Sequence, residues 1–333
     1  MFGLIGDVLQ RTPILKALKE IYPNAEIVAI VDATAQMVLS HNPHVKSMIV
    51  IQKNKADKLQ KNIAKIKGIL SIRKEKFDLF LNLYNGGSSP LLVLLSGARY
   101  KLGFCQKKKP FLYNVKNDCE EERIREAQRV SSYLISIVEP LSEKQYLLEP
   151  VFDVSRSVEE EIREEFLKYN HSINKIYLLN LGSSQEDKIL ENEKYLYIVK
   201  YIYDNYGFIP AIICNPGQEY LQENFINDFL KPSGLQYIKL RIMSLEEIAA
   251  SIKLTPFLIT PDTGLMHLAM AYKQMIFTIF TYTHPLFVNP HNDKFISVFE
   301  HFDEGILYQH QNITEKTLEQ KIQVLFAKLK PSS

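Results

Sequence analysis

The stretch Pro256-Phe-Leu-Ile-Thr-Pro-Asp-Thr-Gly-Leu-Met-His267 joins an apolar strand to a helix through a Pro-Asp-Thr-Gly corner. Asp262 and Thr263 are residue types that cap helices, and Gly264 has no β-carbon to keep a ligand away from the backbone. The first amides of such a helix lack intrahelical partners and lie at its positive end, so the corner is suited to an anion such as phosphate. The alternative is an ordinary strand-to-helix turn, because capping residues occur in most such turns.

Apolar strands alternate with amphipathic helices on both sides of this corner. The expected strands cover residues 26–31, 47–51 and 77–83 in the first half, and 175–181, 209–214, 237–240, 257–260 and 275–280 in the second. This rhythm is typical of βαβ units, whose parallel sheets carry helices on both faces. The sequence therefore predicts an α/β protein with two successive alternating halves.

The charged segment between the halves sets the expected domain boundaries. A chain of 333 residues is long enough for two domains. We expect one domain over residues 1–155, a second over 173–312, and a terminal segment over 313–333. The helix in that last segment has one apolar face, which must dock on another apolar surface.

Composition excludes several classes of protein. The 40 basic and 38 acidic residues nearly balance, so no overall field favours nucleic acid as a partner. The three cysteines show no paired spacing, which argues against a disulfide framework or a zinc site and fits a reducing cytoplasm. No signal peptide and no run of about 18 apolar residues is present. We therefore expect a cytoplasmic protein, soluble or peripheral at a membrane.

Two further loops of the second half follow strands and carry polar groups. Leu181-Gly-Ser-Ser-Gln-Glu-Asp-Lys188 brings Ser183, Ser184 and Lys188 to the carboxyl edge of the sheet, where open α/β folds bind ligands. In Asn215-Pro-Gly-Gln-Glu219, Glu219 could accept hydrogen bonds from ribose hydroxyls. Taken singly, the first loop also fits a plain surface loop, and Glu219 fits an acidic residue that favours a helix start. Three such loops at one edge make a binding site the better interpretation.

The amino end carries a carboxylate in a glycine-flanked loop, Gly3-Leu-Ile-Gly-Asp-Val-Leu-Gln-Arg-Thr-Pro13. Asp7 could be a general base or an N-terminal helix cap. The loop is neither the Gly-x-Gly-x-x-Gly dinucleotide fingerprint nor a phosphate loop, which disfavours a nicotinamide enzyme and a P-loop NTPase.

The remaining polar residues give weaker signals. The sequence has no Asp-x-Asp pair, and an Asn-Pro turn separates His41 from His44, so we expect neither a metal nor a cofactor. His267 fits a ligand contact or a buried structural role equally well. Lys107, Lys108 and Lys109 fit a solvated loop; if functional, they would attract an acidic acceptor or an anionic membrane surface. Arg11 is assigned to the same acceptor.

Together these segments resemble glycosyltransferase family 9, the bacterial lipopolysaccharide heptosyltransferases. The resemblance rests on the following segments: Gly6-Asp-Val-Leu9 with Thr12-Pro13, Ser40-His-Asn-Pro43, Gly97-Ala-Arg-Tyr-Lys-Leu-Gly-Phe104, Asn180-Leu-Gly-Ser-Ser184 with Lys188, Met243-Ser-Leu-Glu246, and Asp262-Thr-Gly-Leu-Met-His267. They follow the family pattern in order and approximate spacing over nearly the whole chain.

The resemblance implies the GT-B architecture, in which two Rossmann-like domains face each other across a cleft. The amino half would bind the acceptor and the carboxyl half the nucleotide sugar, and the last helix would pack back toward the first domain. It makes Asp7 the catalytic base. The implied donor contacts are Ser183, Ser184 and Lys188 at the diphosphate, Glu219 at the ribose, Met243 beside the adenine, and Asp262, Thr263, Gly264 and His267 around the sugar diphosphate.

The chain departs from the family pattern in two places. Family members have a full strand before the Gly-Asp loop, whereas only Met1 to Ile5 precede it here. We expect either that the natural reading frame begins upstream or that residues 2–5 form a shortened strand. The second departure is Lys188-Ile-Leu-Glu191, where the family often has Lys-x-Trp-Pro.

The function that the resemblance implies is inverting, metal-independent transfer of a heptose from ADP-heptose to the lipopolysaccharide inner core. The implied partners are the nucleotide sugar, an acidic lipid-linked saccharide acceptor and the surface of the inner membrane. Two alternatives remain: a family 9 transferase with a different nucleotide-sugar donor, and a catalytically silent nucleotide-binding protein.

Overall fold

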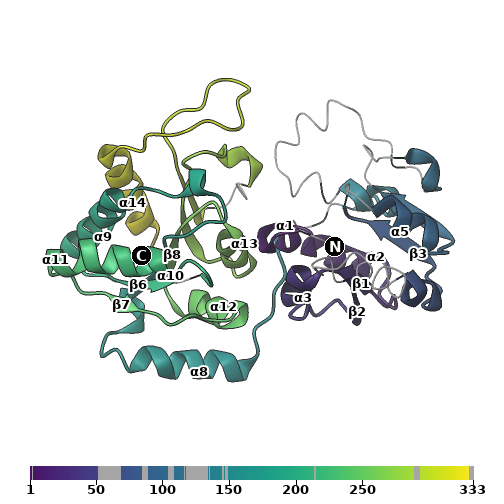
Figure 1. Ribbon diagram of the computed structural model, residues 1–333, viewed down its shortest axis with the longest axis horizontal. Coiled ribbons are helices and arrows are strands. Elements are labelled where there is room, and N and C mark those ends of the chain that lie inside the picture. The colour runs from purple at the N-terminus through teal and green to yellow at the C-terminus, as the bar shows by residue number, and fades with distance from the viewer. Residues whose placement is uncertain are drawn as a thin grey trace. The chain divides into compact units, whose positions relative to one another are not determined.

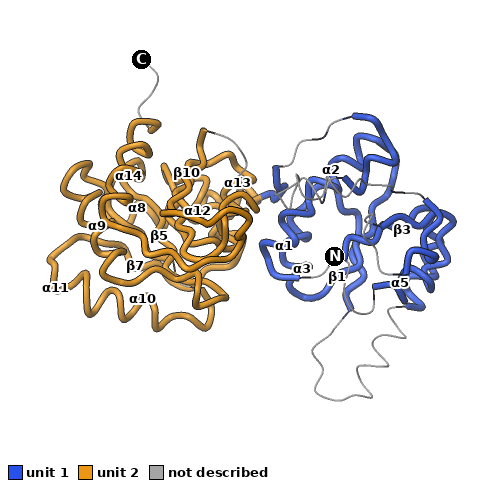
Figure 2. The backbone as a smooth tube through the Cα atoms, turned by 90° about the horizontal axis from the view of Figure 1, so that it is seen from above, with its two compact units in different colours: residues 1–153 blue, residues 154–333 orange. Residues whose placement is uncertain are grey.

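The protein consists of two compact units, Met1–Asp153 and Val154–Ser333, which Figure 2 colours separately. The computed structural model describes residues 1, 3–51, 69–84, 89–103, 109–115, 117, 134, 136–144, 146, 149–213, 215–288 and 293–329. Each unit has its own strands and helices (Figure 1).

Unit 2 contains a six-stranded sheet in which every described pairing is parallel. Its strands are β5 (Ile176–Asn180), β6 (Ile209–Ile213), β7 (Ile238–Lys239), β8 (Phe257–Pro261), β9 (Met275–Ile279) and β10 (Phe295–Val298). They lie in the order β10-β9-β8-β5-β6-β7, so the direction of winding reverses between β5 and β8. This is the doubly wound order, which binds ligands at the reversal point.

Apolar side chains fill both faces of that sheet. Every residue of β5, β6, β8 and β9 is buried, as expected of central strands in a parallel sheet. The helices of the unit are α8 (Arg156–Leu167), α9 (Asn192–Tyr206), α10 (Glu219–Phe225), α11 (Lys231–Ser233), α12 (Leu245–Leu254), α13 (Gly264–Ala271) and α14 (Glu315–Leu329). A π-helical turn, Ile226–Leu230, continues α10.

The terminal helix α14 was expected to dock its apolar face on another apolar surface. Its apolar residues Leu318, Ile322, Leu325 and Phe326 belong to the core of unit 2, together with residues of α9 and of the sheet. The ring of Phe326 stacks on Tyr206 of α9 with 3.7 Å between centroids. The apolar face that was expected to dock on another surface is thus covered within unit 2, and the packing of this helix toward the first domain stays a prediction.

Unit 1 contains two separate parallel strand pairs. Strand β1 (Val28–Val31) pairs with β2 (Ser47–Val50), and β3 (Leu79–Asn82) pairs with β4 (Tyr100–Gly103). The helices are α1 (Ile5–Leu9), α2 (Thr12–Ile21), α3 (Ala33–Leu39) and α5 (Ser89–Leu95), with 3-10 turns at Pro110–Leu112 and Ser136–Leu141. Residues 52–68 and 118–133 lie outside the described residues.

The start of the chain also differs from expectation. We allowed for a shortened strand over residues 2–5, but Gly3 and Leu4 are not in a strand and Ile5 begins α1. The sequence Ile-Gly-Asp-Val-Leu buries Val8 and Leu9 on one side of this short helix. Among the described residues, no strand lies between the two strand pairs of unit 1.

Candidate functional site

The carboxyl ends of β5 and β8 bring two predicted loops of unit 2 together. These strands are direct neighbours, with Leu178 opposite Leu258 and Leu179 opposite Ile259. The loop after β5 leads into the 3-10 turn Glu186–Lys188, and the corner after β8 leads into α13. Residues 80 positions apart in sequence are therefore neighbours at the reversal point of the sheet.

An ion pair joins these loops. The ammonium Nζ of Lys188 lies 2.6 Å from Oδ2 of Asp262, and the two side chains are only 19% and 8% exposed. Such a pair costs desolvation free energy, so removing one partner leaves a poorly solvated charge. The sequence assigned both residues to a phosphate site, and the structure brings them together.

The side chain of Asn180, at the end of β5, links the surrounding groups. This residue is fully buried. Its Nδ2 donates to the Thr260 hydroxyl at 3.0 Å, to the Gly182 carbonyl at 3.1 Å and more weakly to the Thr263 hydroxyl at 3.4 Å. Its Oδ1 accepts from the amide of Gly182 at 3.2 Å. One amide side chain thus fixes both loops at the sheet edge.

The start of α13 has no side-chain cap. Thr263 occupies the N-cap position, but its hydroxyl bonds Thr260 and Asn180 instead of the helix amides. Asp262, the other expected cap, is paired with Lys188. The capping expectation was therefore wrong, and its failure favours the anion-site interpretation, because the first amides of α13 keep no side-chain acceptor of their own.

The loop after β6 packs against the same glycine turn. Nε2 of Gln218 donates to the Ser183 carbonyl at 2.7 Å, and Nδ2 of Asn215 contacts Oδ1 of Asn180 at 3.4 Å. A β-carbon on Gly182 would come within 2.3 Å of Oε1 of Gln218, so any larger residue there would push the Gln218 and Asn215 side chains aside. Ser183 is buried, Ser184 is exposed, and Glu219 lies half-buried in the first turn of α10.

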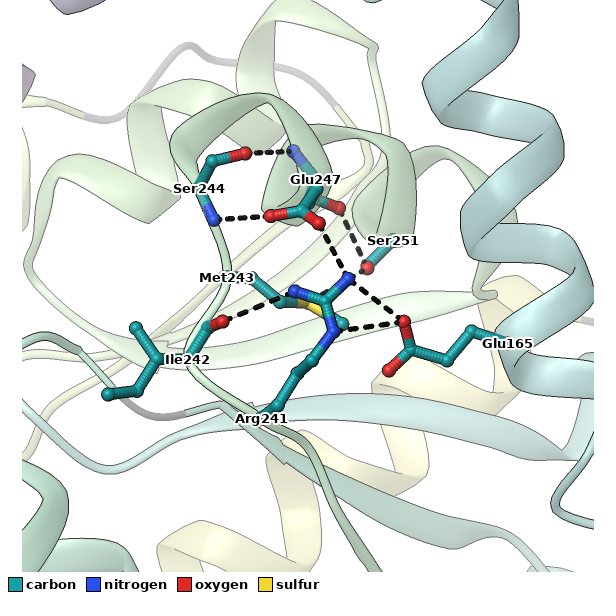
Figure 3. A network of polar contacts seen from close by, with 7 residues as sticks. All are labelled: Glu165, Arg241, Ile242, Met243, Ser244, Glu247 and Ser251. Atoms are coloured by element: carbon teal, nitrogen blue, oxygen red, sulfur yellow. Dashed lines mark hydrogen bonds and ion pairs between the residues drawn. The ribbon is translucent and has the colours of Figure 1, made fainter.

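A polar network holds the loop before α12, as Figure 3 shows. Nη2 of Arg241 lies 2.6 Å from Oε1 of Glu247 and 3.1 Å from Oε2 of Glu165 on α8. Ser244 and Glu247 form a capping box at the start of α12. Met243 is buried between these groups, with its sulfur 3.6 Å from the Ser251 hydroxyl.

His267 lies inside α13 and is 4% exposed. Its backbone position is one turn from the corner, as the sequence predicted. This degree of burial suits the structural role better than direct ligand contact, although both interpretations place the imidazole in the same helix.

A second group of polar side chains lies in unit 1. Asp7 is exposed on α1, and its Oδ2 accepts from the Leu4 amide at 3.1 Å, so the carboxylate takes part in capping this helix. Burial lowers the pKa of Arg11, and electrostatic interaction with Asp7, Tyr84 and Asp32 acts against that shift. Asp32 follows β1 and caps α3 by accepting from the Ala35 amide at 3.0 Å. Arg11 is thus within electrostatic range of two carboxylates, Asp7 on α1 and Asp32 after β1.

The other residues predicted to bind the acceptor are less informative. Lys109 is exposed and has a left-handed backbone conformation with φ of 58°. Lys107 and Lys108 lie outside the described residues. Within the described part of the chain, no group of three or more His, Cys, Asp and Glu side chains is arranged to hold a metal ion. No helix there combines the length and apolar character needed to cross a membrane.

Sequence reasoning missed several residues that shape these sites. Asn180 is the first residue of the segment Asn180–Ser184, and a single polar residue that ends an apolar strand is a usable signal. Gln218 and Asp32 carried no such signal, because their partners come from distant loops. Thr281 was also missed: its hydroxyl donates to the Asp187 carbonyl at 2.7 Å and supports the Lys188 turn.

Comparison with known proteins identifies the family. The model of "Glycosyltransferase family 9 (heptosyltransferase)" matches residues 66–318, which is most of the chain. The chain belongs to glycosyltransferase family 9. It is therefore a glycosyltransferase, and the predicted family is confirmed.

Individual family 9 relatives agree. Lipopolysaccharide heptosyltransferase 1 of Campylobacter coli is 23% identical over 287 residues, covering 83% of this chain and 81% of that protein. The family 9 glycosyl transferase of Veillonella parvula superposes with a TM-score of 0.78 at 18% identity, covering 98% and 96% of the two chains. The Escherichia coli ADP-heptose lps heptosyltransferase II gives a TM-score of 0.77 at 19% identity, covering 99% and 98%. These likenesses confirm the GT-B fold class.

Proposed function

We propose that this family 9 enzyme transfers a heptose from ADP-heptose to a hydroxyl of the lipopolysaccharide inner core, with inversion and without a metal. The observation that carries the proposal is the Lys188–Asp262 pair beside the uncapped start of α13. The similar Escherichia coli structure is described as an ADP-heptose enzyme, which supports the donor. The relatives named as lipopolysaccharide heptosyltransferases support the acceptor.

Unit 2 would hold the donor in this mechanism. Lys188 and the first amides of α13, at Thr263 and Gly264, face the diphosphate and stabilise the negative charge that grows on the leaving ADP. Asp262 orients Lys188 and, once a diphosphate shares the ammonium, contacts the sugar. Ser183 and Ser184 bind phosphate oxygens, Glu219 the ribose, and Met243 lies beside the adenine.

Unit 1 would supply the acceptor chemistry. Asp7 accepts the proton of the acceptor hydroxyl as that oxygen attacks the anomeric carbon opposite the diphosphate. Arg11 and Lys107–Lys109 bind the acidic acceptor, which implies a site of action at the cytoplasmic surface of the inner membrane.

Two substitutions of Asp7 test the base. Asp7→Asn keeps an oxygen that can accept from the Leu4 amide, whereas Asp7→Ala removes both the base and this capping bond. We expect both variants to lose about 10²- to 10⁴-fold in turnover while binding ADP as before, and only Asp7→Ala to lose thermal stability. The assay measures ADP release from ADP-heptose with a truncated lipid acceptor. Wild-type turnover by Asp7→Asn would remove Asp7 from the mechanism.

The same assay separates the two alternatives. A wild-type chain that binds ADP-heptose without turning it over would be the catalytically silent protein. A chain that binds no ADP-heptose would use a different donor, which a panel of nucleotide sugars would identify.

A further inference from the structure

The loop of residues 241–244 connects strand β7 to helix α12 and carries Met243, which the proposed function places beside the adenine of the donor. Strand β7 is only two residues long and lies at the edge of the sheet, where among the described strands it pairs with β6 alone. Sheet pairing therefore cannot fix the shape of this loop. Side chains must do so.

Arg241 makes most of the contacts that hold the loop, as Figure 3 shows. Its Nε and Nη2 lie 3.3 Å and 3.1 Å from Oε2 of Glu165, and Nη2 also lies 2.6 Å from Oε1 of Glu247. Nη1 donates to the Ile242 carbonyl at 3.3 Å. One planar guanidinium thus joins α8, the loop and the first turn of α12, a geometry that the single ammonium of a lysine cannot reproduce.

Helix α8 gives this arginine a fixed anchor. The side chains of Ile162 and Phe166 on α8 are fully buried. A separate ion pair between Glu159 and Lys253 ties the first turn of α8 to the last turn of α12, without involving the loop. Glu165 is therefore a fixed point outside the loop, 76 positions from Arg241 in the sequence.

The bond to the Ile242 carbonyl sets the direction of one peptide group. The C=O and N–H of a planar trans peptide point in opposite directions, so the amide of Met243 points away from the guanidinium. No described residue accepts a hydrogen bond from this amide. The side chain of Met243 is buried, with its sulfur 3.6 Å from the Ser251 hydroxyl, so the loop offers a ligand its backbone and the exposed side chain of Ile242.

We propose that Arg241 is a positioning residue for the base of the donor nucleotide. Anchored on Glu165, it holds the Ile242–Met243 peptide so that the amide of Met243 faces the adenine. This inference rests on the proposed function, because it requires a nucleotide in unit 2. Ring nitrogens of adenine accept hydrogen bonds, whereas N3 of uracil carries a hydrogen, so a misaligned amide costs more affinity for adenine than for uracil. The contacts to diphosphate and ribose lie on other loops.

The experiment compares ADP with UDP, which share the ribose and the diphosphate and differ only in the base. Titration calorimetry on the full chain measures both affinities, and thermal unfolding measures stability. Two variants break the same contact from its two sides: Arg241→Lys keeps the positive charge, and Glu165→Ala changes only α8. The matched control is Glu159→Ala, which breaks the other ion pair between α8 and α12 and leaves the loop untouched.

We expect the wild type to bind ADP more tightly than UDP. Arg241→Lys and Glu165→Ala should each lose about five- to tenfold in ADP affinity, as for one misaligned hydrogen bond, and keep UDP affinity within about twofold. The double variant should lose no more than the larger single effect, because both substitutions break one contact. Glu159→Ala should lower Tm about as much as Glu165→Ala and keep the ratio of the two affinities.

An unchanged ratio of ADP to UDP affinity in Arg241→Lys or Glu165→Ala would overturn the inference, since the arginine would then only stabilise the fold. An equal fall of that ratio in Glu159→Ala would overturn it for the same reason. Equal affinity of the wild type for ADP and UDP would also overturn it, because the loop would not distinguish bases. A wild type that binds neither nucleotide would instead refute the proposed function, and the inference with it.

Discussion

Asn180 shows how one buried side chain organises the donor side of the proposed site. Its amide contacts groups from the loops after β5, β6 and β8. Loss of this side chain weakens the hydrogen bonding of several buried polar groups, at a total cost of about 1–3 kcal/mol. Because those groups belong to the loops proposed to bind the donor, the cost should appear in binding as well as in stability.

We predict that Asn180→Ala destabilises unit 2 by about 1–3 kcal/mol and weakens ADP binding at least tenfold. Urea denaturation and titration calorimetry measure the two effects. The matched control is Asn42→Ala, since Asn42 is also buried and bonds the Val151 carbonyl and the His44 amide within unit 1. It should lose stability and keep ADP affinity. Equal loss of affinity in both variants would mean that Asn180 acts only through stability.

The Lys188–Asp262 pair predicts opposite effects for its two members. Lys188→Ala removes the positive charge and should weaken ADP binding by at least about tenfold, since charge-assisted bonds are the strong ones. Asp262→Asn removes the competing anion but keeps a hydrogen-bond acceptor, so ADP should bind at least as tightly as to the wild type. Calorimetry at two salt concentrations checks both, with the salt dependence reduced only in Lys188→Ala. Weaker ADP binding by Asp262→Asn would show that this carboxylate is needed to position the ammonium.

At the scale of elements, the positions of strands could be predicted well from the sequence. The hydrogen bonds at helix ends could not. The corner strand was expected over 257–260 and covers Phe257–Pro261, because an apolar run of that length fits only a buried strand. The predicted side-chain cap of α13 was wrong because both candidates have distant partners. Asp262 bonds Lys188, 74 positions away, and Thr263 bonds Asn180, 83 positions away. Local pattern carries no information about such partners. The sequence also missed strand β10 (Phe295–Val298).

The start of α12 carries a prediction that depends on pH. The bond to Arg241 lowers the pKa of Glu247 from its usual 4.5, and the Ser244 backbone and side chain act in the same direction, while burial opposes them. A lowered pKa in the folded state stabilises the protein above the unfolded value, and this contribution disappears as the pH falls through the folded value. Arg241 is 44% exposed, so solvent screening limits the gain to about 1 kcal/mol or less.

Glu247→Gln should therefore lower the free energy of unfolding at pH 7 and converge on the wild type as the pH falls below about 4.5. Urea denaturation between pH 3 and 7 measures the difference. The control is Glu160→Gln, whose carboxylate pairs with Arg156 on the exposed face of α8 and should contribute little at any pH. A difference between wild type and Glu247→Gln that does not vary with pH would contradict the assignment to charge.

At the scale of the whole molecule, the two units differ in how their described strands are joined into sheets. Unit 2 has a six-stranded sheet with four fully buried strands, and α14 closes its core. Among its described residues, unit 1 has two separate pairs of parallel strands. The sequence predicted two α/β halves from their alternation. The expectation that the strand before the Gly-Asp loop is shortened or lies upstream already distinguished the first half from the second.

We predict that residues 154–333 alone fold and bind ADP with the affinity of the full chain but transfer no sugar, because the proposed base Asp7 lies in unit 1. Circular dichroism, a cooperative thermal transition and calorimetry with ADP test this.

The matched control is residues 154–313, which lack α14 and expose the core face that Phe326, Ile322 and Leu318 cover. We expect this fragment not to fold cooperatively. If 154–333 stayed unfolded while the full chain folded, unit 2 would depend on unit 1. Sugar transfer by 154–333 would instead move the catalytic base into unit 2, where exposed acids of the donor loops such as Glu186 would be the next candidates.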